Sequence, residues 1–445
     1  MTADELRSLL DNPAQRAAVG SVELTTALLD RIGSLQDVLH AFITVVPERA
    51  LEQARRVDAA RARGRRPPLD GMPIAVKDNI DVGGVLTTEG TGAFAARTAF
   101  RSAPAVARLE AAGAVVLGKL NLHELAFGPS SDNPHHGFCR NPWDLQRAAG
   151  GSSSGSAVAI AADLCAGALG TDTGGSIRIP AALTGVSGLR PSPGLVSLRG
   201  TRALGPSLDT VGPLARSAET LAELLSAMAG TEFSPYQADL RGLKLGVPAG
   251  HFFEGLDPEV EAAVTSAIDG LRSLGADVST AELGGVREAL ADAWTVTRHE
   301  AFRTHRSMLR RSAGGLGADV EERLLDGAAI SRRQYEDALR GARSWRQAVR
   351  SSFEAVDLLV TPTVPRTAPS REEARLPDVR ARLSTLTLPL SLALVPSASV
   401  PCGFTSAGLP IGMQLAAKAG EDDLVLRVAS AYQRVSDWHL RRPSP

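Results

Sequence analysis

Short apolar runs along the chain mark the strands that we expect. Residues 71–76, Gly-Met-Pro-Ile-Ala-Val, form one such run, which ends directly at Lys77. Residues 114–117 and 355–360 have the same character, and residues 408–415 add a turn and a further strand. Apolar runs of about four to eight residues between glycines, prolines and polar residues are typical of buried strands. The sequence therefore predicts a buried sheet in which one strand carries Lys77 at its end.

Apolar residues at helical spacing separate these runs. Leu24, Leu28 and Ile32 share one face of a helix that Ser21 can cap. Strands and helices alternate along the chain, which predicts an α/β layered fold. The other predicted helices cover residues 54–66, 105–112, 258–274, 285–355 and 422–436, and a polar loop covers residues 364–385.

The composition excludes several classes of function. The 445 residues include 22% charged side chains and carry a net charge of −1, so no overall field attracts a nucleic acid or an anionic membrane. The N-terminus lacks the basic and apolar segments of a secretion signal, and the most apolar stretches, residues 157–170 and 386–401, are too short or too broken by proline to span a bilayer. The three cysteines show no metal-ligand spacing and are expected as buried reduced thiols. We therefore expect a cytoplasmic protein with no nucleic-acid or membrane partner.

Lysine is rare in this chain. Only four of the 48 basic residues are lysines, at positions 77, 119, 244 and 418, and the others are arginines. A buried lysine can lose its proton and act as a base, whereas a guanidinium stays charged. Lys77 is therefore a candidate for chemistry that arginine cannot perform.

Glycine and serine dominate two neighbouring segments, residues 150–156 and 170–180. Such segments can cradle a phosphate, surround a nucleophile with N–H donors, or form a plain turn or linker. No Gly-Lys-Ser/Thr and no G-x-G-x-x-G pattern supports a phosphate site. The G-x-S-x-G pattern at residues 151–155 lacks the preceding apolar strand of a nucleophile elbow. Taken alone, the first segment is equally well interpreted as a turn.

The sequence Thr173-Gly-Gly-Ser176 in the second segment is more specific. Two glycines before a serine allow consecutive N–H groups to converge beside the hydroxyl, as in an oxyanion hole built around its own nucleophile. Asp172 and Arg178 flank this turn and can pair across it. The pattern makes Ser176 the candidate nucleophile.

A serine nucleophile needs a base, and the sequence offers two kinds. Lys77 is the first, and its alternative role is that of a structural cation paired, for example, with Asp78. His135 and His136 are the second, although a Pro-His-His-Gly turn favours a structural or substrate-facing role for them. The residues alone leave this choice open.

Several stretches together resemble the amidase signature family over roughly residues 20–435. The resemblance implies an α/β fold, a single large α/β/α layered domain around a mixed, twisted sheet. We expect this domain to span residues 1–445, with its core at about 60–215 and 355–435 and a more variable helical region at about 235–355. The matching stretches are residues 69–80, 118–124, 140–143, 150–156, 170–180, 207–213 and 408–414.

The same resemblance implies a catalytic triad. Its nucleophile falls on Ser176, its base on Lys77, and its bridging serine, which follows a cis peptide bond, on Ser152; the separation of 24 positions between the two serines matches the family's spacing. The family's activity implies hydrolysis of a small-molecule amide through an acyl-enzyme, without a metal or cofactor, and allows a homodimer. The oxyanion donors would be the N–H groups of Thr173, Gly174, Gly175 and Ser176, and the supporting residues Ser153, Asp172 and Arg178.

Two other functions compete with a free-standing amidase. The catalytic A subunit of a tRNA-dependent amidotransferase has the same signature, and Arg346 and Glu421 fall near the positions that would hold its glutamine. The Tyr-Gly-Arg and Arg-Tyr-Gly elements of those subunits are missing around residues 193–200, which favours the free-standing hydrolase. A catalytically silent scaffold subunit is disfavoured because the whole triad is present. Residues 123–138 and 295–350 are expected to line the substrate pocket.

Overall fold

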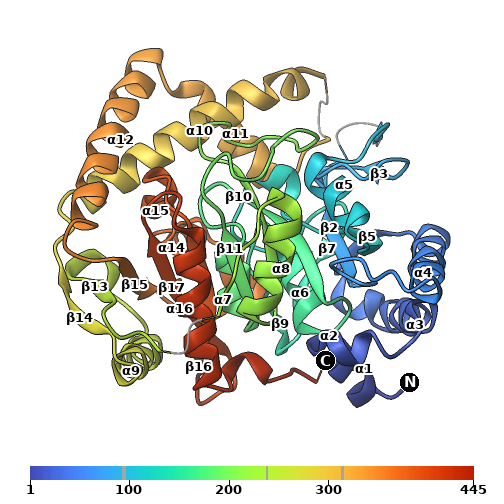
Figure 1. Ribbon diagram of the computed structural model, residues 1–445. Helices are drawn as coiled ribbons and strands as arrows, with labels where there is room; N and C mark the ends of the chain where they lie inside the picture. Colours follow the sequence, from blue (N-terminus) through green and yellow to red (C-terminus); the bar gives the residue numbers. More distant parts are fainter. Residues whose placement is uncertain (93–96, 237–238, 312–314, 445) are drawn as a thin grey trace.

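A single mixed sheet of eleven strands forms the centre of the computed structural model, which describes residues 1–444 except 93–96, 237–238 and 312–314 (Figure 1). Neighbouring strands run parallel between β5, β2 and β10 and between β15, β13 and β14, and antiparallel elsewhere. Across the sheet the order is β1 (Phe42–Val45), β5 (Val115–Leu120), β2 (Pro73–Lys77), β10 (Gly167–Asp172), β12 (Thr210–Ala215), β11 (Ser187–Arg190), β16 (Ser397–Phe404), β17 (Pro410–Ala417), β15 (Leu358–Pro362), β13 (Lys244–Pro248) and β14 (Asp277–Ala281).

Helices and three small two-stranded ladders surround this sheet. The ladders pair β3 (Leu86–Thr87) with β4 (Arg97–Thr98), β6 (Asp132–Asn133) with β7 (Gly137–Phe138), and β8 (Arg140–Asn141) with β9 (Asp144–Ala148). The helices are α1 (Ala3–Asp11), α2 (Pro13–Arg16), α3 (Ser21–Leu39), α4 (Pro47–Ala62), α5 (Pro104–Ala111), α6 (Ser154–Ala161), α7 (Arg178–Thr184), α8 (Ala218–Ala229), α9 (Pro258–Ser273), α10 (Val286–Arg311), α11 (Ala318–Ala329), α12 (Arg332–Ser352), α13 (Arg371–Arg375), α14 (Pro377–Leu383), α15 (Leu388–Leu392) and α16 (Asp422–Arg434), with 3₁₀ turns at Glu124–Ala126, Gly250–Phe252 and Trp438–Leu440.

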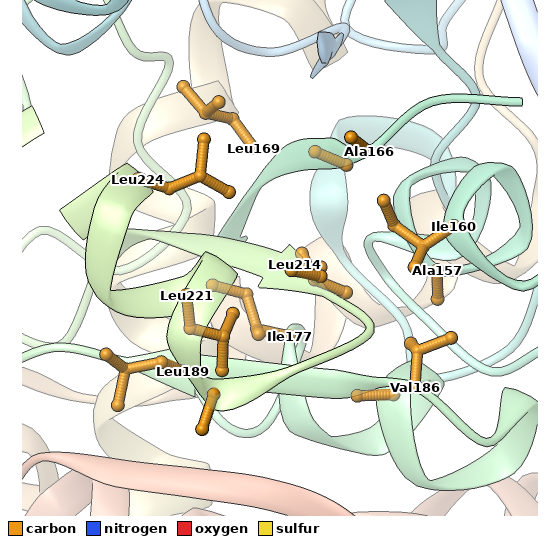
Figure 2. Close-up of a cluster of buried hydrophobic side chains, with 14 of the residues drawn as sticks. Ala157, Ile160, Ala166, Leu169, Ile177, Val186, Leu189, Leu214, Leu221 and Leu224 are labelled. Carbon is orange, nitrogen blue, oxygen red and sulfur yellow. The ribbon is translucent and has the colours of Figure 1, made fainter. Parts of the chain in front are cut away.

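Helices cover both faces of the central strands, so the fold has three layers: helices, sheet and helices. Gly167 and Gly170 lie on β10, three positions apart, so they present opposite faces of the sheet. The face at Gly167 packs on Leu224 of α8, whereas the face at Gly170 meets Ser153 and Ile177. Figure 1 shows α8 and α16 side by side over the strands, and Figure 2 shows the buried apolar cluster between β10, β12, α6 and α8. The predicted α/β/α architecture is confirmed.

The predicted first helix forms, but a different group caps it. Leu24, Leu28 and Ile32 are buried on one face of α3 as predicted. Ser21 is the first helical residue rather than the cap, and its N–H donates to Asp58 Oδ1 at 2.7 Å. Asp58 lies on α4, so a carboxylate from a neighbouring helix supplies the acceptor that the local sequence was expected to provide.

The predicted polar loop at residues 364–385 is wrong in part, because it contains α13 and α14. Ser370 and Glu373 form a reciprocal capping box at the start of α13, and Pro377 opens α14 at its first turn. Both are recognisable helix starts, and the high density of charge in this segment obscured them. Of the helices in the described ranges, none is long and apolar enough to cross a membrane.

Candidate active site

The Lys77 side chain ends in a cage of hydroxyl groups. Its ammonium lies at the end of β2, fully buried, and donates to Ser152 Oγ at 2.8 Å and Ser153 Oγ at 2.9 Å. The third acceptor is Thr171 Oγ1, at 2.7 Å, on the adjacent strand β10. Because parallel strands β2 and β10 carry Lys77 and Thr171 to the same edge of the sheet, the sheet fixes where this amine sits. Sequence reasoning missed Thr171.

Burial and the lack of a carboxylate partner set the charge of Lys77. Its pKa falls to about 7 because burial disfavours the ammonium form, although the more distant Asp172 and Asp209 partly oppose the shift. Within the described residues, no carboxylate lies within ion-pair distance of Lys77. Asp78, the structural partner considered above, pairs instead with the buried Lys119, whose Nζ lies 2.7 Å from Asp78 Oδ1. Lys77 can therefore exist as a neutral amine near neutral pH.

Ser152 and Ser153 are held between Lys77 and the second Gly/Ser segment. The peptide bond between Gly151 and Ser152 is cis, as the family resemblance implied. A side chain at residue 151 would overlap the carbonyl oxygen of Ser130, so only glycine fits there. The Ser153 N–H donates to the Ser176 carbonyl at 3.0 Å, which joins the two segments directly.

The turn from Thr173 to Ser176 exposes N–H groups beside the Ser176 hydroxyl. Gly175 has a φ of 126°, which a side chain rarely adopts, and a Cβ there would overlap Thr387. Its N–H donates to Asp172 Oδ1 at 2.8 Å, so the expectation that Gly175 is an oxyanion donor needs correction. The N–H groups of Thr173, Gly174 and Ser176 have no acceptor among the described residues and remain available.

A fully buried ion pair between Asp172 and Arg178 holds the turn at residues 173–176 in place. Arg178 donates to both carboxylate oxygens of Asp172, at 2.9 and 3.0 Å, as the sequence suggested. Arg190 also approaches Asp172 Oδ1, at 3.4 Å. Burial alone would raise the pKa of Asp172, but the two guanidinium groups outweigh it and hold that pKa below its usual range. Asp172 therefore stays ionised and keeps the turn in one conformation.

The same arginine connects the turn to the C-terminal strands. Arg178 donates to Gln414 Oε1 at 2.6 Å and to Ser391 Oγ at 2.7 Å. Thr387, which directly precedes α15, donates from Oγ1 to the Gly174 carbonyl at 2.7 Å. Motifs more than 200 residues apart in the chain thus converge on one loop.

Asp209 is a buried carboxylate that sequence reasoning did not assign. It accepts hydrogen bonds from Thr173 Oγ1 at 2.5 Å, from the Leu204 N–H at 2.9 Å and from the Gly205 N–H at 3.2 Å. Burial raises the pKa of Asp209 to about 6, although these donors lower it. Its position within the Ser-Leu-Asp motif at 207–209 was the available signal. Asp209 ties the oxyanion turn to the loop beside it.

The imidazoles of both alternative bases contact residues other than the two serines of the proposed triad. His135 Nε2 lies 2.9 Å from Glu124 Oε1, and His136 Nε2 lies 3.4 Å from Thr88 Oγ1. Lys77, in contrast, contacts Ser152 and Ser153, and the Ser153 N–H donates to the Ser176 carbonyl. The geometry therefore favours Lys77 over both histidines.

A largely apolar hollow of about 430 Å³, including the part open to solvent, lies next to Ser176. Residues 126–129, Thr297 and Arg323 line it, and they lie in the two regions expected to form the pocket. The oxyanion turn and Trp294 also line it, together with four residues outside those regions: Ile179, Leu204, Ser384 and Leu388. Arg346 and Glu421 do not line it; Arg346 Nε donates to the Leu392 carbonyl at 2.9 Å, and Glu421 is exposed at the start of α16. The described residues contain no cluster of His, Cys, Asp and Glu able to hold a metal ion.

Comparison with known proteins defines the class. The family model described as Amidase matches residues 23–426, and the chain belongs to this amidase signature family. The A subunit of glutamyl-tRNA(Gln) amidotransferase from Roseiflexus sp. (strain RS-1) is 41% identical, with 96% of each chain covered. A solved structure from work on a vestigial protein complex and the origins of an s-triazine catabolic enzyme has a TM-score of 0.89 at 34% identity, with 100% of each chain covered. A crystal structure of an amidase has a TM-score of 0.87 at 34% identity, with 98% of this chain and 100% of that chain covered.

Proposed function

We propose that this chain cleaves carboxamide bonds through an acyl-enzyme on Ser176. The observation that carries the proposal is the environment of Lys77: a buried amine with a pKa of about 7, 2.8 Å from Ser152 Oγ and next to the turn that bears Ser176. A buried neutral amine is a base, and a serine beside unpaired N–H groups is a nucleophile.

The proposed reaction proceeds in two halves. Neutral Lys77 accepts a proton from Ser152 as Ser152 accepts one from Ser176, and Ser176 Oγ attacks the amide carbon. The N–H groups of Thr173, Gly174 and Ser176 stabilise the oxyanion. The proton returns through Ser152 to the leaving amine, the C–N bond breaks, and water then hydrolyses the ester on Ser176. Ser153, Asp172 and Arg178 position these groups.

Covalent labelling tests this proposal without knowledge of the substrate. A fluorophosphonate should label the wild-type chain on Ser176, and the Ser176→Ala variant should be unlabelled while melting at a similar temperature. A silent scaffold subunit would remain unlabelled in both forms. A panel of amides scored for ammonia release then searches for the substrate.

A second candidate is the glutamine-cleaving A subunit of a tRNA-dependent amidotransferase. The 41% identity over nearly the whole length of a protein with that name supports this candidate more directly than it supports a free-standing amidase. Against it, Arg346 and Glu421 lie outside the hollow beside Ser176. If this candidate is right, the chain works with other subunits and with tRNA. The expectation of no nucleic-acid partner would then be wrong. The homodimer is untested and stays a prediction.

Ammonia release separates the two candidates. The amidotransferase candidate expects glutamine to be the best amide in the panel, with a further increase in rate when partner subunits and glutamyl-tRNA are added. The free-standing candidate expects another amide to exceed glutamine in kcat/KM with the isolated chain. Arg346→Ala and Glu421→Ala should then leave turnover unchanged.

A further inference from the structure

Three side chains of α10 line the hollow that contains Ser176 or a second hollow that adjoins it. Trp294, Thr297 and Arg298 are spaced i, i+3 and i+4, which places them on one face of the helix. Trp294 and Thr297 line the hollow that contains Ser176, and Arg298 lines a second hollow of about 550 Å³. The two hollows share Phe127, Pro129, Trp294 and Arg323 as walls, so they adjoin.

Arg298 is a cation without an acidic partner. Its guanidinium carbon lies 5.3 Å from the centre of the Trp294 ring, and no carboxylate of the described residues lies within ion-pair distance of it. Its neighbour Arg323, which lines both hollows, differs in having an acidic partner: it donates to the Phe127 carbonyl and, at 3.0 Å, to Asp319. The half-buried Arg298 therefore keeps its hydrogen-bond donors available at the outer end of the pocket.

Thr297 is a second unpaired polar group on the same face. Its side chain is 5% exposed, and its hydroxyl has no hydrogen-bond partner among the described residues. A buried hydroxyl without a partner is unfavourable, so such groups normally meet a water or a ligand. Thr297 lines the hollow that contains Ser176 and directly precedes Arg298 on α10.

The charges around Arg298 leave a positive interior. Arg323 and Arg380 share one partly buried carboxylate, that of Asp319, at 3.0 and 3.7 Å. The two acidic side chains that line the second hollow, Glu322 and Asp326, are exposed, so solvent screens them. An anionic group that reached the inner part of this hollow would meet more positive than negative charge.

We infer that Arg298 binds a carboxylate on the acyl part of the substrate, with Thr297 as a second polar contact. Trp294 and Phe127 would cover the apolar segment between that carboxylate and the amide at Ser176. The inference rests on the proposed amide cleavage at Ser176 and narrows its substrate to the monoamides of dicarboxylic acids. Guanidinium–carboxylate pairing is strong and directional, which suits this recognition.

The experiment compares charged and neutral amides of equal length. Ammonia release is measured for succinamate, glutaramate and adipamate against butyramide, valeramide and hexanamide. For at least one pair, wild-type kcat/KM should favour the carboxylate by about tenfold to a hundredfold, as expected for a hydrogen-bonded ion pair. Arg298→Gln should remove that preference, chiefly by raising KM, and Arg298→Lys should keep part of it. Arg306→Gln, an exposed position on the same helix outside both hollows, is the matched control and should behave as wild type.

The inference is overturned if Arg298→Gln lowers turnover of charged and neutral amides equally, or if wild type prefers no carboxylate although a fluorophosphonate labels Ser176. If labelling and turnover both fail, the proposed amide cleavage fails instead. Calorimetric titration of glutaramate into Ser176→Ala protein then tests Arg298 alone. Weaker binding after Arg298→Gln than after Arg306→Gln supports the inference, and equal or absent binding overturns it.

Discussion

Lys119 Nζ lies 2.7 Å from Asp78 Oδ1, and both side chains are completely buried. Asp78 directly follows Lys77 in the sequence, but its carboxylate is engaged by Lys119. Lys77 is therefore left with three hydroxyl groups as its acceptors. The two buried lysines therefore have different roles. Burial lowers the pKa of both, but Lys119 has a carboxylate counter-ion that opposes this shift, whereas Lys77 has none within ion-pair distance among the described residues and can lose its proton near neutral pH.

The substitution Lys77→Arg separates a base from a structural cation. A guanidinium keeps its proton near neutral pH, so we expect a folded protein whose kcat falls by about a thousandfold or more. The measurement is kcat with a melting curve on the same preparation. Lys244→Arg, at an exposed position, is the control and should be silent. A variant of Lys77 with near-native kcat would end the lysine-base mechanism and return His135 and His136 to consideration.

Activity should follow the deprotonation of Lys77. A pKa of about 7 in the folded protein, lowered from 10.5, means that kcat/KM rises about tenfold per pH unit below 7 and levels off above about 8. Asp209 raises the pKa of Lys77 through its charge, so Asp209→Asn should move the midpoint to lower pH, whatever its effect on the maximal rate. This amine should titrate between about pH 6 and 8. A kcat/KM that stays constant over that range contradicts the assignment of Lys77 as the base.

Two adjacent serines contact Lys77, and their alanine variants should differ. Ser152→Ala should lower kcat strongly, by about a hundredfold or more, because it removes the proposed proton relay. Ser153→Ala removes a hydrogen bond of nearly the same length, 2.9 against 2.8 Å, without removing that relay. It should therefore keep much more activity. Wild-type activity in Ser152→Ala, or the reverse order of the two variants, would move the relay to another hydroxyl.

The substitution Gly175→Ala tests the oxyanion turn. An added Cβ overlaps Thr387, and the φ of 126° disfavours any side chain, so the N–H groups of Thr173, Gly174 and Ser176 must shift. We expect kcat to fall by about a hundredfold or more, the scale of one lost oxyanion donor. Gly194→Ala is the matched control: its φ of 86° is also positive, but the space around it is open. That control should lower stability by about 1–2 kcal/mol and leave kcat unchanged.

The sequence alone predicted the layered α/β architecture and the candidate nucleophile Ser176, and its resemblance to the amidase signature family supplied Ser152 and Lys77 as the rest of the proposed triad. Alternating apolar runs and helical spacing are local signals, and Gly175 and Ser176 stand in a local motif, so both can be recognised without a structure. The strand that ends at Lys77 was likewise predictable, because its apolar run and the lysine that follows are contiguous.

Only the tertiary structure decided which groups those residues meet. Asp78 forms an ion pair with Lys119, and the Gly175 N–H donates a hydrogen bond to Asp172. Arg298 has no carboxylate partner among the described residues, although the sequence around it is rich in charge. Such pairings depend on how distant segments pack, and one-dimensional spacing does not encode that packing. The same holds for protonation, because the pKa of Lys77 follows from the exclusion of water by strands and helices that join only in the folded chain.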